Sequence, residues 1–186
     1  MTARFRLNIA ADYLLAGGVV AYPTEAVYGI GCLPLEIGAV ARILALKGRS
    51  KRKGLILVAA EFEQLAPYVT LPGGPIAAEI VSSWPGPVTW ILPARRNVPD
   101  YLTGGRDTLA VRVTAHPATA ELCTRAASPL VSTSANRTGR APARSGLAVH
   151  RQLGSALDHI YVGTLGDSAQ PTLIRDAESG RVLRGT

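Results

Sequence analysis

The chain contains little of what disulfide frameworks and metal sites are built from. Only two cysteines, Cys32 and Cys123, occur in 186 residues, and they form no CxxC pair and no Cys/His spacing typical of zinc. We therefore expect neither a disulfide framework nor a zinc site. Cysteine usage this sparse favours a reducing compartment, so the expected location is cytoplasmic.

Long apolar runs are also missing. The apolar segments stop far short of the roughly 20 residues that a membrane span requires. Basic residues precede apolar ones near the N-terminus, but Asn8 and Asp12 interrupt that run, which argues against a signal peptide. We expect no membrane association from this chain.

Several familiar motifs of phosphate binding and hydrolysis are absent. The sequence has no GxxxxGK[ST] loop, no HExxH and no GxSxG. Gly29-Ile30-Gly31 is only a GxG fragment without the third glycine of a dinucleotide site, and by itself it predicts a turn.

Acidic residues are few compared with basic ones. Asp and Glu total 13 against 20 Lys and Arg, which gives a formal charge of +7 and points to acidic partners such as nucleotides or RNA. A hydrophobic content of 47% argues against disorder. A chain of this length buries about 70% of its unfolded surface, so we expect a single domain over residues 1–186.

Strand and helix patterns alternate along the chain and predict an α/β layer structure. Helices are expected from an Asn8 cap to Gly17, and at 35–47, 61–65, 76–83 and 117–127. Strands are expected at 18–23, 55–60, 88–94, 107–114, from 129, at 158–163, 172–177 and 181–185. The last two would form a hairpin turning at residues 178–180, and 136–146 would be a flexible loop.

The segment PTEAVYGIG, residues 23–31, places Thr24, Glu25 and Tyr28 after a predicted strand. Ligands of open α/β sheets bind beyond the carboxyl ends of strands, so these side chains are candidates for a site. A structural turn in which Glu25 caps a helix is an equal alternative.

The segment KGRSKRK, residues 47–53, holds five basic residues and no acid. The presence of Lys47 has a local explanation, because the last turn of a helix favours cations. The others indicate either a solvated loop or an anion site. Lys47 and Arg49 are expected at an exposed helix end, outside the core.

Arg112 and the segment STSAN, residues 132–136, complete the set of candidates. A guanidinium within an apolar strand requires an anion, supplied by a protein carboxylate such as Asp107 or by a ligand. The hydroxyls and amide of STSAN also occur in ordinary turns. Because cations and hydroxyls outnumber general bases, the pattern favours phosphoryl or nucleotidyl transfer, catalysed by positioning and charge stabilisation with a metal ion.

Five segments taken together resemble the YrdC-like threonylcarbamoyl-AMP synthases, particularly their short bacterial form, TsaC. They are PTEAVYGIGC, LKGRSKRKGLILVAA, WPGPVTWILPA, LAVRVTAHP and LVSTSANRTG. The family's KxR and SxN elements match Lys47 with Arg49 and Ser134 with Asn136. The resemblance implies a twisted open mixed α/β sheet with flanking helices and a large, positively lined concave cavity.

The resemblance also implies a reaction. L-threonine, bicarbonate and ATP, with Mg²⁺, would give threonylcarbamoyl-AMP and pyrophosphate. A tRNA threonylcarbamoyl transferase complex would then modify an adenosine beside the tRNA anticodon. No motif identifies metal ligands.

The site residues that the resemblance implies fall into three groups. The catalytic group is Lys47, Arg49, Ser134 and Asn136; ATP would contact these four together with Lys53 and Arg184; threonine would contact Thr24, Tyr28, Arg112, Ser132 and Thr172.

Two other functions remain open at this stage. An RNA-binding module would use the basic concave face, although ten aromatic residues and no RNA motif offer it little support. A carbamoyl-adenylating domain, as in hydrogenase-maturation proteins, is the second. In either the enzyme or the module, Lys51, Arg52, Arg137 and Arg140 are candidates for weak tRNA or double-stranded RNA binding. Arg137 and Arg140 could instead clamp the ATP phosphates.

Overall fold

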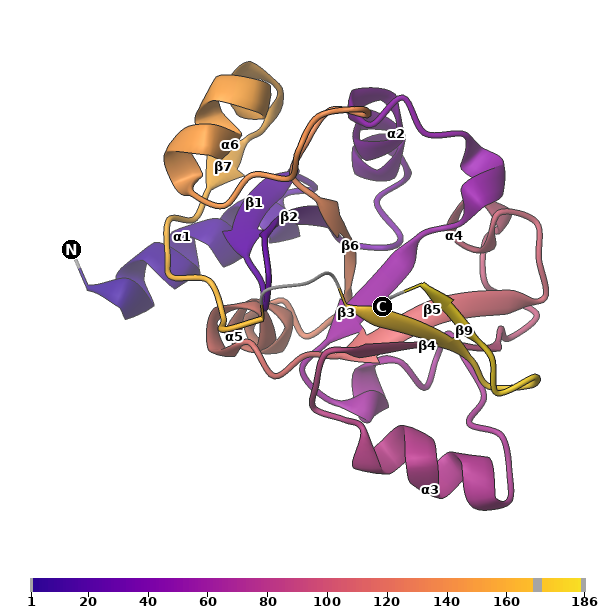
Figure 1. Cartoon of the computed structure of the whole chain (residues 1–186). Helices are drawn as coiled ribbons and strands as arrows, with labels where there is room; N and C mark the ends of the chain where they lie inside the picture. The colour runs from indigo at the N-terminus through magenta and orange to yellow at the C-terminus, as the bar shows by residue number, and fades with distance from the viewer. Residues whose placement is uncertain (1, 169–171, 185–186) are drawn as a thin grey trace.

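The computed structural model describes residues 2–168 and 172–184, and within them nine strands form one mixed sheet (Figure 1). The spatial order is β7-β1-β2-β6-β3-β5-β4-β8-β9. The strands are β1 Val20–Pro23, β2 Tyr28–Cys32, β3 Ile56–Ala59, β4 Val88–Pro93, β5 Thr108–Val113, β6 Leu130–Ser134, β7 His159–Ile160, β8 Leu173–Asp176 and β9 Val182–Arg184.

Helices flank this sheet. They are α1 Ala3–Leu15, α2 Ile37–Leu46, α3 Pro75–Ser82, α4 Asp100–Thr103, α5 Pro117–Arg125 and α6 Gly146–Leu153, with short 3₁₀ turns η1 Lys51–Lys53, η2 Phe62–Gln64 and η3 Gly154–Ala156. Strands β3 and β5 run parallel, whereas β6 is antiparallel to both of its neighbours, β2 and β3. The expected open mixed α/β sheet with flanking helices is therefore confirmed.

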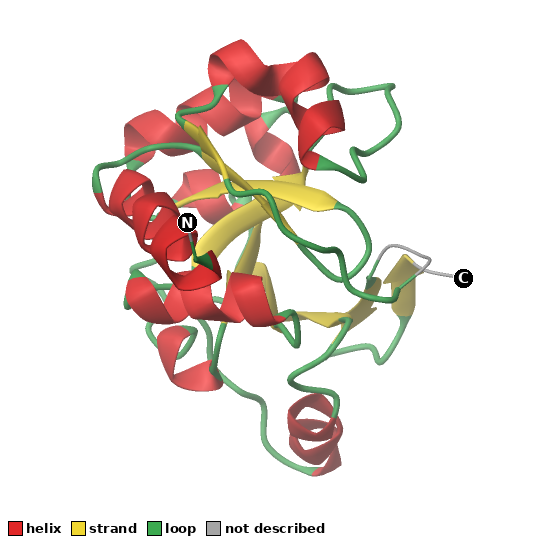
Figure 2. Ribbon diagram, turned by 90° about the vertical axis from the view of Figure 1, so that its left-hand side faces the viewer, coloured by secondary structure: helices red, strands yellow, loops and turns green. Residues whose placement is uncertain are grey.

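Two apolar clusters cover the two faces of the sheet. The larger packs α2, α3 and α6 against β2, β3, β4 and β5, with Trp90 and Ile43 fully buried. The smaller packs α1 and α5 against Val20, Tyr22 and Leu130 on the opposite face. In Figure 2 the β8–β9 hairpin, beside the C-terminal label, stands apart from the helices. Among the described residues, the smaller cluster contains none from β4 or β5, so this part of the second face has no helix packed over it.

The GxG fragment lies within strand β2, so the predicted turn at this position is wrong. Tyr22 on β1 lies opposite Gly29 in the antiparallel register, and its ring crosses the neighbouring strand. A Cβ on Gly31 would lie 2.4 Å from the Tyr22 hydroxyl and 2.3 Å from the Val131 carbonyl. Glycine is required here because another group approaches the strand closely, not because the chain turns.

Other predicted boundaries need smaller corrections. Helix α1 begins five residues before the expected Asn8 cap, because the Thr2 hydroxyl accepts from the Phe5 amide and caps it. The expected helix at 61–65 is a 3₁₀ turn, and α6 falls where no helix was expected. The predicted terminal hairpin is confirmed by the antiparallel pairing of β8 with β9. No described helix is long and apolar enough to cross a membrane.

Candidate active site

The uncovered part of the sheet is recognisable from alternating burial. Ser132 pairs with Ile56, Ile56 with Ala110, and Ala110 with Ile91, so these side chains share one face. Ile56, Ala110 and Ile91 are half-buried, whereas the adjacent residues on the opposite face, such as Leu57 and Val111, are fully buried. This face is accessible to a ligand.

A cavity of about 310 Å³ opens on this face, which is within the size range of small-molecule sites. Strands β4, β5 and β9, the end of helix α4, the Lys53–Leu55 segment and the loop before β5 contribute its walls. Its charged lining residues, Lys53 and Arg106, are both basic. Sequence reasoning missed Arg106, although a basic residue in the glycine-rich turn just before the strand of Arg112 was a usable signal.

Lys47 lies at one margin of this face and is buried, with 6% of its surface exposed. Its ammonium donates to the Ser134 carbonyl at 2.7 Å, to the Asn136 carbonyl at 2.7 Å and to the Asn136 Oδ1 at 2.7 Å. The Ser134 hydroxyl lies 3.3 Å away. The expected exposed position is wrong: Lys47 directs its donors into the protein and joins the KxR element to the SxN element.

Asn136 organises the loop that follows β6. Its Oδ1 also accepts from the Ser134 hydroxyl at 2.7 Å, and its Nδ2 donates to the carbonyls of Arg137 at 3.0 Å and Arg140 at 2.6 Å. The Thr138 hydroxyl contacts the Lys47 carbonyl. Residues 136–140 of the segment expected to be a flexible loop therefore form a turn that these hydrogen bonds hold in place.

Burial lowers the pKa of Lys47 to about 8, and the neighbouring Arg49 charge acts in the same direction. The acceptors around the ammonium are carbonyl, hydroxyl and amide oxygens, which carry no formal charge. At neutral pH, Lys47 is still mostly protonated, because its pKa remains above 7.

Arg49 is half-buried and shapes the basic segment after α2. Its guanidinium donates to the Gly54 carbonyl at 2.9 Å and lies 3.4 Å from the Lys53 carbonyl. Lys51, Arg52 and Lys53 form the exposed turn η1 that these contacts hold. Arg49 thereby places Lys53 at the rim of the cavity.

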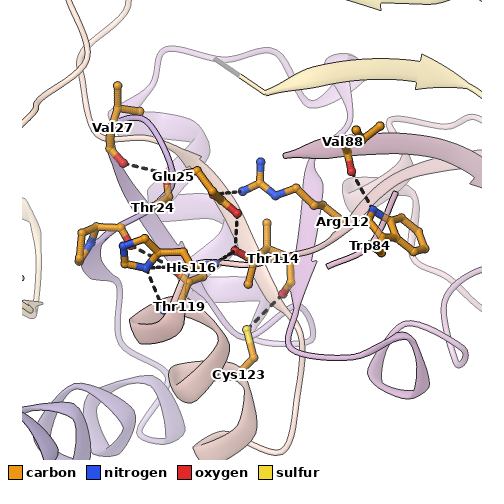
Figure 3. Close-up of polar contacts among 12 residues, drawn as sticks. Thr24, Glu25, Val27, Trp84, Val88, Arg112, Thr114, His116, Thr119 and Cys123 are labelled. Atoms are coloured by element: carbon orange, nitrogen blue, oxygen red, sulfur yellow. Dashed lines mark hydrogen bonds and ion pairs between the residues drawn. The ribbon is translucent and has the colours of Figure 1, made fainter. Parts of the chain in front are cut away.

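Arg112 is buried on β5, with 5% exposure, and its counterion is Glu25. The Arg112 Nη2 lies 3.2 Å from the Glu25 Oε2, and the Thr114 hydroxyl donates to the Glu25 Oε1 at 2.5 Å (Figure 3). The suggested partner Asp107 is wrong. Asp107 lies in the bend before β5, five residues and thus about 16 Å of strand away from Arg112, too far to reach the guanidinium.

The structure brings Thr24 and Ser132 together but separates Tyr28 from them. A Cβ on Gly29 would lie 3.2 Å from the Thr24 methyl and 3.3 Å from the Ser132 hydroxyl, so both flank this glycine. Tyr28 is in the core of the opposite face, where its hydroxyl donates to the Gly163 carbonyl at 2.7 Å. Its position speaks against a direct contact with a ligand near Ser132.

The remaining candidates lie at the periphery. Thr172 is half-buried immediately before β8. Arg184 ends β9, and its side chain lies outside the described part of the chain. Arg137 and Arg140 are exposed on the turn around Asn136, where the Arg137 Nε donates to the Gln152 carbonyl at 3.2 Å.

Carboxylates are scarce around the site. Within residues 2–168 and 172–184, no group of three or more His, Cys, Asp or Glu side chains could hold a metal ion. The arrangement therefore combines a cationic margin, a hydroxyl-bearing strand end and one buried Arg–Glu pair. Such a site can bind an anion and, separately, a carboxylate.

Comparisons with known proteins identify the family of the chain. The sequence model of the Sua5/YciO/YrdC family, described as telomere recombination, matches residues 12–185. A threonylcarbamoyl-AMP synthase of Halorhodospira halophila is 55% identical over 183 residues, covering 98% of this chain and 96% of the relative. One from Nitrosococcus oceani is 52% identical and covers 97% of each chain.

A solved structure extends the comparison to three dimensions. The P. abyssi Sua5 structure complexed with L-threonine superposes with a TM-score of 0.84 at 35% identity, covering 92% of this chain and 51% of that one. The present chain thus corresponds to about half of that protein. From the match over residues 12–185 and the relatives above 50% identity, the chain belongs to the Sua5/YciO/YrdC family.

Proposed function

We propose that the protein is a threonylcarbamoyl-AMP synthase, which forms threonylcarbamoyl-AMP and pyrophosphate from L-threonine, bicarbonate and ATP. The observation that carries this proposal is identity above 50% over nearly the whole chain to relatives of that name. The site supports it, because a cationic margin suited to a triphosphate adjoins a buried arginine suited to an amino-acid carboxylate.

On the amino-acid side, Arg112 would hold the threonine carboxylate through paired N–H donors. Thr24 and Ser132, which flank Gly29, would line the same subsite. Thr172, from the segment before β8, would complete it. Bicarbonate would convert the amine to a carbamate at this place, with water as the other product.

On the nucleotide side, a carbamate oxygen would attack the α-phosphorus of ATP, and pyrophosphate would leave. Arg49, Lys53 and Arg106 would stabilise the charge that accumulates on the phosphate oxygens, with Arg184 as a further candidate. Ser134 would offer its hydroxyl. Lys47 and Asn136 would hold Ser134 and the following turn in place, since their polar groups bond to one another.

Magnesium would enter with ATP. The described side chains include no cluster of three or more His, Cys, Asp or Glu, so they do not form a magnesium site made of several protein ligands. Mg²⁺ commonly binds through substrate phosphates and retained waters, where it neutralises phosphate charge. None of the steps above depends on a protein-bound metal.

Downstream, a tRNA threonylcarbamoyl transferase complex in the cytoplasm would consume the adenylate. The exposed basic side chains Lys51, Arg52, Arg137 and Arg140 would give weak, sequence-independent binding to tRNA or double-stranded RNA.

The test is direct product formation. The protein is incubated with ATP, bicarbonate and labelled threonine, and threonylcarbamoyl-AMP and pyrophosphate are quantified, with each substrate omitted in turn. We expect both products only in the complete mixture. Binding of tRNA without any adenylate would favour an RNA-binding module, and turnover with carbamoyl phosphate in place of threonine would favour a carbamoyl-adenylating domain.

A further inference from the structure

We infer that Glu25 is a positioning residue that orients Arg112 toward the carboxylate of the amino-acid substrate, with Thr114 as its anchor. This inference rests on the proposed function. It assigns a role to an acidic side chain that contacts Arg112 in the amino-acid subsite.

The three side chains form a buried chain of contacts. Arg112, Glu25 and Thr114 are only 5%, 6% and 2% exposed. The Glu25 carboxylate lies between the other two, 3.2 Å from the Arg112 Nη2 through Oε2 and 2.5 Å from the Thr114 hydroxyl through Oε1 (Figure 3). The two carboxylate oxygens therefore face different partners, Oε1 in a hydrogen bond with Thr114 and Oε2 in an ion pair with Arg112, which orients the group.

The main chain of Glu25 is held as firmly as its side chain. The Ser168 amide donates to the Glu25 carbonyl at 3.1 Å, and the Gly166 amide donates to the Thr24 carbonyl at 3.0 Å. A Cβ on Gly166 would lie 2.9 Å from the Glu25 Cα, so this segment packs directly on the turn between β1 and β2. Such support is what a precisely oriented side chain needs.

Thr114 is oriented by its own neighbours. Its amide donates to the Ala59 carbonyl at 3.0 Å, and its hydroxyl oxygen accepts from the His116 amide at 3.1 Å. The same hydroxyl donates its hydrogen to Glu25, so both of these bonds hold it in one orientation. His116 in turn caps α5 through its Nδ1, 3.4 Å from the Thr119 amide. The anchor is thus tied to the end of β5 and the start of α5.

The contacts of Glu25 and Thr114 affect how Arg112 binds a substrate carboxylate. A bidentate arginine–carboxylate contact requires the guanidinium plane to be set correctly, and a guanidinium has five N–H donors that can serve carboxylates on different edges. A resident carboxylate also stabilises the buried charge when substrate is absent. Glu25 would therefore lower the threonine KM by preorganising Arg112, without touching the nucleotide.

If the Arg112–Glu25 ion pair had only a structural role, removing Glu25 would have a different effect on the kinetics. If Glu25 only stabilised the fold, its loss would lower the melting temperature and affect threonine and ATP to the same extent. If it positions Arg112, the loss falls on threonine alone. The two substrates of one enzyme thus act as controls for each other.

The experiment compares Glu25→Gln and Thr114→Val with wild type, with Thr114→Ser as the variant that keeps the hydroxyl and Glu178→Gln as an exposed control. For Glu25→Gln and Thr114→Val, we expect the threonine KM to rise about tenfold, which corresponds to the loss of one charge-assisted hydrogen bond between Arg112 and the substrate carboxylate. The ATP KM should stay within about twofold. Thr114→Ser should restore most of the threonine affinity, and Glu178→Gln should match wild type.

A second readout does not require turnover. Stabilisation of the protein by threonine alone, measured by thermal denaturation without ATP, should weaken in Thr114→Val and recover in Thr114→Ser. An unchanged threonine KM, or equal changes for both substrates, in the variants overturns the inference. If Glu25→Gln fails to fold, the Thr114 pair decides alone. Absence of adenylate from wild type would instead overturn the proposed function.

Discussion

Two buried cations border the open face of the sheet, and the protein surrounds them differently. Among the described residues, Lys47 donates to uncharged oxygens of Ser134 and Asn136, whereas Arg112 faces the carboxylate of Glu25. The first cation therefore keeps its net positive charge, and the second belongs to a pair with no net charge.

The difference separates two kinds of recognition. An uncompensated charge beside Arg49 attracts a triphosphate over several ångströms, because Coulomb interactions are long-ranged in a partly buried site. A neutral pair exerts little field at a distance, so the amino-acid subsite must select its ligand by the geometry of hydrogen bonds. One fold thus supports an electrostatic subsite and a geometric one on the same sheet.

Replacing Lys47 should have the largest effect. Lys47→Met would leave the Ser134 and Asn136 oxygens without their donor, so we expect a loss of roughly 2–4 kcal/mol in the free energy of unfolding. Adenylate formation should fall by about 100-fold or more, because Ser134 and the adjoining turn lose their position. Thermal denaturation and product assays measure the two effects, and Lys51→Ala on the exposed turn is the control. Wild-type stability in Lys47→Met would contradict this account of the cluster.

Arg112→Lys should weaken threonine binding in the amino-acid subsite and leave ATP binding almost unchanged. The ammonium keeps the charge and can still pair with Glu25, but it lacks the planar fork that matches a carboxylate. We expect the threonine KM to rise about 30-fold and the ATP KM to stay within about twofold. Initial rates at varied threonine and varied ATP test this. A threonine response like that of wild type would reduce Arg112 to a structural partner of Glu25.

The contrast between the two cations also shows what the sequence predicts and what it does not. Strand periodicity placed Arg112 within β5 and placed the SxN element at the end of β6, and both were confirmed. Periodicity concerns neighbours along one strand, so it could not select Glu25, which reaches Arg112 from the turn after β1. Asp107 is nearer to Arg112 in sequence but lies in the bend before β5, a strand length away from the guanidinium.

The predictions for Lys47 and for the GxG fragment were wrong for a related reason. A lysine at the last turn of a helix is usually solvated, and only the return of β6 beside α2 buries this one. Glycines usually mark turns, and only the Tyr22 ring across β2 explains why Gly31 stands in a strand. In each case a contact distant in sequence overrides a sound local rule.

The titration of Lys47 allows a reversible test of its cluster. Its pKa is lowered to about 8, so the ammonium is lost as the pH rises past that value. We expect kcat/KM for ATP, which reports the free enzyme, to fall about tenfold between pH 7 and pH 9. Bound triphosphate stabilises the ammonium, so the corresponding fall in kcat should occur at higher pH.

Asn136→Asp provides the matched variant for this titration. A carboxylate beside the ammonium favours the charged form and raises the pKa of Lys47, so the alkaline fall in kcat/KM should move upward. The same change neutralises the charge that attracts ATP, which should raise the ATP KM about tenfold below pH 8. If wild type and variant decline at the same pH, a group other than Lys47 controls the profile.

The smallest effect is expected from the exposed arginines beside the Lys47 cluster. Asn136 Nδ2 bonds to the backbone carbonyls of Arg137 and Arg140, so replacing both side chains by alanine keeps the acceptors that hold this turn. If the two arginines serve RNA, tRNA retention should weaken several-fold and its log–log salt dependence should decrease by about 2, the number of charges removed. The ATP KM should stay within about twofold.

A higher ATP KM with unchanged tRNA retention would instead make this turn a clamp on the phosphates and extend the electrostatic subsite outward from Lys47. If neither quantity changes, the turn is a solvated connection, and Lys51→Ala with Arg52→Ala becomes the variant that must reduce tRNA retention for RNA binding to stand.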